Sequence, residues 1–409
     1  MAESQKATLR PKGVAWQALR ARLGGMSRQL RLFILASFVM GVAYSIIDAT
    51  LNNFLNDRFA LSGFQRSFLE FPRELPGALV VFVTAVLWFL GTRRLGILAM
   101  LLGVAGTLLL GFASPTYAAV VMCLFVYSLG QHLFMPVSST VGMELAHEGK
   151  TGARLGQLNA IRNFATICGS FIVYACFRLL GLTYNTTFVL SATGFLIAAV
   201  LLFAMQKQQQ EPPRAYLKLR KEYRLYYLLS VLYGSRKQLF ITFGPWVIVT
   251  VFNQPTTTMA TLATIGGVIG ILFQPLLGRA VDRLGERTVL VAEALLLMVV
   301  CAGYGFSRSL FPDATAFLLI CIFYLLDQML MSVNMARTTY MKKIALRPED
   351  VQPALTASVT LDHMVSICIA LLGGVIWNTF GFQYVFLLGV GIAALNFIAA
   401  LRIRLPRPA

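Results

Sequence analysis

The sequence is poor in charged residues and rich in long apolar runs. Of its 409 residues, 13% are charged and 57% are hydrophobic, whereas soluble domains carry about 25% charged residues. Runs of about twenty apolar residues recur along the chain, which is enough for a helix to cross a ~30 Å hydrocarbon core. This composition excludes a soluble globular domain and predicts an all-α integral membrane protein.

The sequence also lacks the spaced motifs that build enzyme and metal sites. Its six cysteines lie within apolar runs and include no CxxC, so we expect small core residues rather than disulfides or metal ligands. No phosphate loop, metal-ligand constellation or nucleophile–base pair is visible. The sequence therefore predicts no enzyme, no metal and no cofactor. A cleavable signal peptide is not visible before the first apolar run, which begins near Leu32.

Twelve apolar segments can be delimited, six on each side of a polar linker. The first six are 31–54, 67–91, 95–113, 117–140, 155–179 and 184–205. The second six are 226–251, 259–280, 288–306, 315–338, 353–377 and 383–402. We predict a tail over 1–28, a six-helix bundle over 29–205, a linker over 206–224, a second bundle over 225–403 and a tail over 404–409.

Lysine and arginine are distributed unequally between the two sets of connections. One set, which includes both tails and the linker, holds 27 of the 35 basic residues, and the other holds only Arg58, Arg66 and Arg308. By the positive-inside rule, both termini lie in the cytoplasm, and we expect a multi-pass protein of a bacterial inner membrane. The net charge of +18 then follows mostly from topology and does not indicate nucleic acid. Residues 14–23 are either an amphipathic helix on the membrane surface or part of a solvated tail.

The two halves show a faint internal repeat. NAIRNFATIC at 159–168 matches VTLDHMVSIC at 359–368 in the placement of polar residues, and YSLGQHL at 127–133 resembles YLLDQML at 324–330. Both pairs fall at equivalent positions of a six-helix repeat. Transporters built from parallel repeats produce such matches.

The turn GRAVDRLGERT at 278–288 places five charged residues between two apolar segments. Its pattern resembles the signature loop of the major facilitator superfamily, through Gly278, Asp282, Arg283, Gly285 and Arg287. With twelve spans in a 6+6 layout, the resemblance covers nearly the whole chain. It implies two pseudo-symmetric six-helix bundles, alternating access and a gating role for these five residues, with Glu293 as one candidate partner of the arginines. Alternatively, the charges only anchor the turn at the lipid headgroups.

Two further patterns give conflicting indications about whether the chain is a drug antiporter. The corresponding turn of the first half, FLGTRRLGI at 89–97, has Arg93 where the family has aspartate, and 163–177 lacks the glycine-proline antiporter signature. In contrast, IDATLNNFL at 47–55 resembles the first helix of some proton-driven drug exporters, through Asp48, Thr50 and Asn53.

Ionisable residues inside spans cost roughly 2.5–3.5 kcal/mol each and therefore need a partner or a function. The resemblance implies that spans 1, 4, 7 and 10 line a central cavity. That arrangement would place Asp48, His132, Asp327 and either Arg236 or Lys237 around one chamber. Glu70, Arg73 and Glu74 share one helix face. They form either a local ion cluster, for which Arg58 and Arg66 are candidate partners, or part of the transport path. A structural salt bridge such as Lys237 with Asp327 is the alternative to ligand or proton handling.

The candidate site residues fall into two groups. The candidates for proton coupling are Asp48, Glu74, Asp327, Asp362 and His363. The candidates for substrate binding are Asn52, Gln131, His132, Arg162, Arg236, Lys237, Trp246 and Gln328.

The sequence thus predicts a monomeric secondary active transporter that works by alternating access. We expect proton coupling and a small organic substrate, with the basic residues favouring an organic anion or a zwitterion. A proton-coupled multidrug efflux antiporter is the first alternative. A non-transporting membrane receptor or scaffold is the alternative from another class.

Overall fold

The computed structural model describes residues 26–146, 151–206, 219–347 and 350–404, and these ranges are helical without any strand. The predicted helix at 14–23 lies outside the described residues. Most of the predicted linker and of both predicted tails also lies outside them.

The helices form two sequential sets. The first set contains α2 (Arg28–Phe59), α3 (Gly63–Phe68), α4 (Glu70–Val86), η1 (Trp88–Leu90), α5 (Gly91–Phe112), α6 (Tyr117–Glu144), α7 (Thr151–Arg178) and α8 (Tyr184–Phe203). The second set contains η2 (Lys221–Tyr223), α9 (Arg224–Trp246), η3 (Val247–Val251), α10 (Thr256–Leu310), α11 (Asp313–Met331), α12 (Asn334–Ile344), α13 (Val351–Phe380) and α14 (Phe382–Leu401).

The twelve predicted spans are confirmed. Nine helices within the described residues are long and apolar enough to cross a membrane. One of them, Thr256–Leu310, is a hairpin of two spans, because Gly285 breaks it with φ 79° and ψ 159°. The other two spans are α4, which has only 17 residues, and α9, which carries Arg236 and Lys237.

The positive φ of Gly285 is a backbone conformation that only glycine adopts readily. Gly285 therefore allows the tight turn in the signature loop.

Polar residues at the ends of apolar segments set where several helices begin. The Ser27 hydroxyl accepts a hydrogen bond from the Leu30 amide at 3.2 Å and caps α2. Ser62 and Gln65 form a reciprocal capping box at the start of α3. Thr116 caps α6. Each side chain satisfies a backbone group that the first helical turn leaves unpaired.

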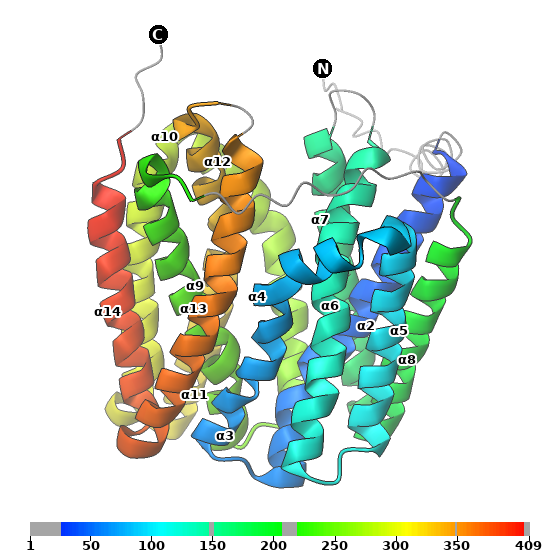
Figure 1. The fold of residues 1–409 in the computed structure, drawn as a ribbon. Coiled ribbons are helices and arrows are strands. Elements are labelled where there is room, and N and C mark those ends of the chain that lie inside the picture. The colour runs from blue at the N-terminus through cyan, green and yellow to red at the C-terminus, as the bar shows by residue number, and fades with distance from the viewer. Residues whose placement is uncertain (1–25, 147–150, 207–218, 348–349, 405–409) are drawn as a thin grey trace, which may run out of the picture.

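Each half of the chain folds into its own bundle with its own apolar core. In the first bundle α5 packs against α6 and α8, and α2 packs against α7 and α8. In the second bundle α10 packs against α11 and α14, and α9 packs against α13 and α14. Figure 1 shows the two bundles side by side, with α2 beginning and α14 ending at the same end of the molecule. We call this end the terminal end and the opposite one the far end.

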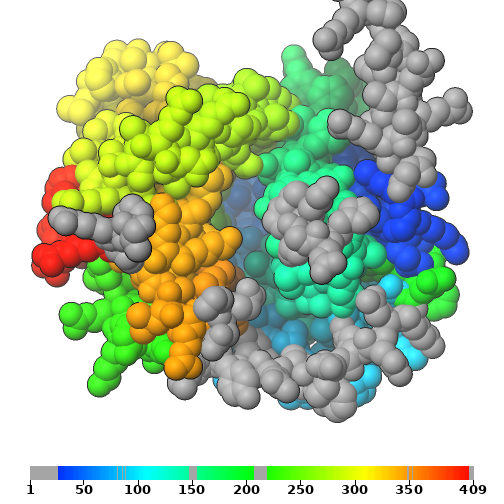
Figure 2. Space-filling view, turned by 90° about the horizontal axis from the view of Figure 1, so that it is seen from above, coloured from blue at the N-terminus to red at the C-terminus, as the bar shows by residue number. Residues whose placement is uncertain are grey.

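The bundles meet at the far end. There the Asn53 side chain donates to the Gln254 carbonyl at 2.8 Å, and the Phe64 amide donates to Asn378 Oδ1 at 3.2 Å. The Tyr184 and Thr256 hydroxyls lie 3.1 Å apart. Seen from the terminal end, the molecule is hollowed between α7 and α12 (Figure 2). The bundles are therefore joined at the far end and parted at the terminal end.

Glycines permit close approach between helices of the first bundle. A methyl group on Gly130 of α6 would lie 2.5 Å from the Ala99 carbonyl oxygen of α5, and one on Gly106 would lie 2.6 Å from Tyr127 Cα. These contacts are with backbone, which cannot move aside as a side chain can. Small residues of this kind let membrane helices pack closely without the hydrophobic effect.

We expect Gly130→Ala to destabilise the protein by about 1–3 kcal/mol, the usual cost of overpacking. Gly270→Ala is the matched control, because no atom lies within 4 Å of the added methyl group and alanine favours helix. Thermal unfolding of both purified variants measures the effect. Equal stability of the two variants would contradict the packing argument.

Candidate functional site

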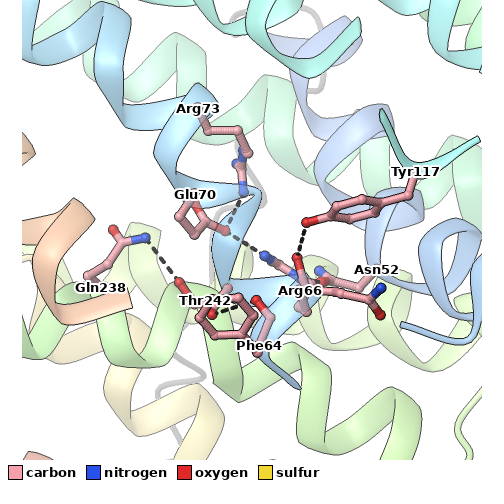
Figure 3. A network of polar contacts seen from close by, with 10 residues as sticks. Asn52, Phe64, Arg66, Glu70, Arg73, Tyr117, Gln238 and Thr242 are labelled. Atoms are coloured by element: carbon pink, nitrogen blue, oxygen red, sulfur yellow. Dashed lines mark hydrogen bonds and ion pairs between the residues drawn. The ribbon is translucent and has the colours of Figure 1, made fainter. Parts of the chain in front are cut away.

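A chain of polar contacts runs along the first bundle from α2 through α3 to α4 (Figure 3). Arg66 donates to Asn52 Oδ1 at 2.9 Å and to Glu70 Oε1 at 2.6 Å, and Arg73 donates to the same oxygen at 2.9 Å. Arg66 and Glu70 are fully buried. Glu70 thus belongs to a local ion cluster with Arg66 and Arg73, one of the two arrangements that the sequence allows.

Trp246 links this chain to the second bundle. It lies at the end of α9 but packs into the apolar core of the first bundle, and the Arg66 guanidinium carbon lies 6.0 Å from its ring centroid. Cation–π contact of this kind is favourable where water is excluded. Asn52 and Trp246, both candidates for substrate binding, therefore take part in the contact that joins the bundles towards the far end.

Three further side chains meet between the bundles, one from each of α4, α6 and α13. His363 Nδ1 of α13 lies 2.6 Å from Glu74 Oε2 of α4. The ring centroids of His363 and of His132 on α6 are 4.9 Å apart. We call Glu74, His132 and His363 the interface triad. Although Glu74 shares a helix face with Glu70, it binds the opposite bundle and not the Arg66–Glu70–Arg73 cluster.

Lys237 of α9 pairs with Asp362 of α13, next to the interface triad. Lys237 Nζ lies 2.5 Å from Asp362 Oδ2, and both side chains remain partly exposed, at 16% and 19%. The suggested pairing of Lys237 with Asp327 is wrong, because the adjacent residues 236 and 237 point in different directions around the helix. Of the two adjacent cations, Arg236 and Lys237, Lys237 is thus the one that stays partly accessible.

Arg236 points into the interior of the second bundle, where four charges balance. It pairs with Asp327 of α11 and lies 3.8 Å from Glu293 of α10, which in turn binds Arg337 of α12 at 2.7 Å. The four side chains are at most 2% exposed. We call them the buried cluster. The expectation that Asp327 lines the central chamber is wrong, since its partners enclose it within one bundle.

The remaining candidates form no ion pair with these groups among the described residues. Asp48 of α2 is exposed, and Arg73 and Glu70 are charged residues near enough to influence it. Gln131 and Gln328 are partly buried. Arg162 is exposed and donates to Asn159 of the same helix at 2.5 Å.

Most charges of the signature loop are exposed at the terminal end. Asp282, Arg283 and Arg287 are exposed, whereas Glu286 is buried and binds Lys343 at 2.7 Å. The suggested pairing of Glu293 with an arginine of this loop is wrong, because Glu293 is enclosed in the buried cluster.

Comparison with known proteins agrees with this architecture. The Major Facilitator Superfamily profile matches residues 225–409, and no curated protein matches the chain in sequence. A mutant of the nucleoside transporter NupG has a similar structure, with a TM-score of 0.74, 13% identity and coverage of 92% of this chain and 99% of that one. A D-xylose-proton symporter has a TM-score of 0.69 and 18% identity, with coverage of 92% of this chain and 97% of that one. An auto-inhibited POT family peptide transporter has a TM-score of 0.69 and 13% identity, with coverage of 94% of this chain and 99% of that one.

The chain has the major facilitator fold. The resemblance inferred from the signature loop and the 6+6 layout is thereby confirmed, as is the prediction of a multi-pass membrane protein. Identities of 12–18% to the solved structures establish the fold and not the substrate.

The sequence gives no role to Arg337 and suggests the wrong partners for Glu293, although the structure pairs these two buried residues with each other. Arg337 lies in sequence at the start of a connection on the terminal side. Glu293 lies within the apolar run 289–306, where a lone carboxylate is itself a sign of a buried partner. Glu293 and Arg337 lie on α10 and α12, so spacing along the chain does not reveal their pairing, whereas Arg66 and its partner Glu70 are only four residues apart.

The buried cluster predicts a specific double-mutant result. Arg236→Met should destabilise the protein by about 3–5 kcal/mol, because it leaves two carboxylates facing one arginine in a dry interior. The variant that combines Arg236→Met with Asp327→Leu should recover most of this loss, since Glu293 and Arg337 remain paired. Thermal unfolding of the four proteins in the cycle measures the coupling. Additive losses would show that Arg236 and Asp327 do not act as a pair.

Proposed function

We propose that the chain is a proton-coupled secondary active transporter of a small organic anion or zwitterion that works by alternating access. The observation that carries this proposal is the contact between Glu74 and His363. It joins the two bundles at mid-depth through groups that can each gain or lose a proton. An ionisable contact at that position links protonation to the relative movement of the bundles.

Movement of the bundles must break this contact. Glu74 lies on α4 and His363 on α13, so parting the helices separates the carboxylate from the imidazole. An isolated carboxylate in a cavity of low dielectric constant takes up a proton more readily than one paired with imidazolium. Proton uptake by Glu74 would therefore favour the state in which Glu74 and His363 are separated. Proton release would favour the state in which they are in contact.

The charges between the bundles suit a substrate that carries a negative group. Lys237 is a partly accessible cation beside the interface triad, whereas Arg236 is enclosed. A carboxylate of the substrate could replace Asp362 as the partner of Lys237, and Asp362 or Asp48 would remain for a positive group. One protein of similar structure is a D-xylose-proton symporter, and this likeness supports coupling to protons.

Asp48 supports the second candidate, a proton-coupled multidrug efflux antiporter. Its carboxylate on α2 is exposed, as a cationic drug would require. Uptake assays with labelled anions and with cationic dyes distinguish the two. A receptor that does not transport would bind a ligand without flux into proteoliposomes.

The location and the gating role are part of the same proposal. The positive-inside distribution supports a terminal end in the cytoplasm of a bacterial cell. We infer that the conformation seen here is inward-facing and that the transporter acts as a monomer. The exposed Asp282, Arg283 and Arg287 then correspond to a signature loop whose contacts have been released. We infer that these contacts, together with Gly278 and Gly285, form when the terminal end closes.

Neutralising Glu74 should separate coupling from substrate movement. We expect Glu74→Gln to lose uphill accumulation while counterflow exchange of substrate persists, because the carrier no longer exchanges a proton with each cycle. Uptake with and without a pH gradient in proteoliposomes measures this. Asp313→Asn is the control, since Asp313 is 82% exposed at the start of α11. Uphill transport that survives in Glu74→Gln would move the coupling site to Asp48 or Asp362.

Lys237 should determine affinity for the negative group of the substrate. We expect Lys237→Gln to fold but to raise the KM for an anionic substrate by about tenfold or more, as loss of a charged contact worth about 1.5–3 kcal/mol implies. The combined Lys237→Gln and Asp362→Asn variant should remain impaired. Arg308→Gln at the far end is the control. Recovery of transport in the double variant would reduce Lys237 to a structural partner of Asp362.

A further inference from the structure

We propose that the interface triad is a binding site for one divalent transition-metal ion, of which Zn²⁺ is the probe. The ion would join the two bundles and hold the conformation seen here. Glu74 and His132 come from α4 and α6 of the first bundle, and His363 comes from α13 of the second. Binding of the ion does not depend on the proposed transport function, and it can be measured separately.

The ligand atoms are already close together. One carboxylate oxygen of Glu74 and one ring nitrogen of each histidine all lie within 4.8 Å of one another. Zinc bonds of about 2.0–2.2 Å in a tetrahedral arrangement set neighbouring ligand atoms roughly 3.3 Å apart. The ion would therefore draw the most distant ligands together and open the 2.6 Å contact between His363 and Glu74. Both changes are small enough for side-chain rotation.

The surroundings of His132 fix which ring nitrogen is available. The Ser128 hydroxyl donates to the Arg73 carbonyl, so it cannot also donate to the nearby Nδ1 of His132. His132 Nδ1 therefore carries the proton and donates to the Ser128 carbonyl at 2.9 Å. Its Nε2 keeps a free lone pair. A hydrogen bond from one imidazole nitrogen to a backbone carbonyl is the arrangement that orients metal-binding histidines.

Gly77 provides the space in which this lone pair faces the other ligands. A methyl group on Gly77 would lie 2.7 Å from His132 Nε2 and 2.7 Å from His363 Cε1. The absence of a side chain thus lets both rings approach α4. Any larger residue at position 77 would push the two imidazoles away from this place.

The charge and donor types suit zinc better than magnesium or calcium. Two imidazoles and one carboxylate, with a fourth position left for water, form a donor set that zinc takes in proteins, whereas Mg²⁺ and Ca²⁺ prefer oxygen ligands alone. Lys237 is the cation closest to the triad in the second bundle, and Asp362 balances it at 2.5 Å. The Glu74 carboxylate is then left to offset the charge of the ion.

Bound metal would oppose alternating access. Every ligand of the triad must separate from those of the other bundle when the bundles move apart. An ion held by both bundles stabilises the joined conformation in proportion to the logarithm of its concentration over Kd. Zinc would therefore act as an inhibitor that competes with protons for Glu74 and the two imidazoles.

Direct titration tests the site. Full-length protein purified without a histidine tag should bind Zn²⁺ at one site per chain in calorimetry. Glu74→Gln, His132→Gln and His363→Gln should each weaken binding by about tenfold or more, as loss of a ligand exceeds the effect of losing an outer partner. The sequence has only three histidines, so His147→Gln, which lies outside the described residues, is the matched control. Loss of binding in His147→Gln, or unchanged binding in the three triad variants, would overturn the proposal.

A distance measurement tests the joining of the bundles. Spin labels at Gly156 of α7 and Lys342 of α12, both exposed at the terminal end, report the opening between the bundles. In a background without native cysteines, Zn²⁺ should narrow the distance distribution to that of the present conformation, and His363→Gln should abolish the change. A zinc response that persists in His363→Gln would refute the bridging role. Glu74→Gln that loses uphill transport but retains zinc binding would refute the metal site and leave the proton-coupled transporter intact.

Discussion

The structure depends on the requirement that charges inside the hydrocarbon region be neutralised. A lone ion at mid-span costs several kcal/mol, so each buried carboxylate needs a cation or a proton, and each buried cation needs an acid. The chain meets this requirement in two ways. Within each bundle it encloses ions against one another, as in the buried cluster and in the Arg66–Glu70–Arg73 group. Between the bundles it pairs groups that can exchange partners.

This division separates structural charges from mobile ones. Arg236 and Asp327 belong to the same bundle, so rigid-body movement leaves their distance unchanged. Glu74 and His363 belong to different bundles, so the same movement must separate them. Lys237 and Asp362 are intermediate, because they lie in one bundle but their side chains remain partly exposed. The proposed proton, substrate and metal functions all draw on charges that lie between the bundles or remain partly exposed.

The same feature explains why protons and zinc would use one site. Imidazole and carboxylate groups accept a proton or a metal ion with the same lone pairs. In the proposed transport cycle this contact opens, and its atoms are then available to any cation that reaches them.

Much of the fold follows from the sequence alone. Apolar segment length determines the number of spans, because a helix must satisfy its own backbone in lipid, and Gly285 with the charged 278–287 turn marks where α10 doubles back. The tertiary structure alone decided the partners. Arg236 and Lys237 are neighbours in sequence, yet a rotation of about 100° per residue sends one into the buried cluster and the other to Asp362. Glu74, His132 and His363 are far apart along the chain, and only the docking of α4, α6 and α13 brings them together. The packing of apolar faces, and not the charges, fixes how helices from two bundles align.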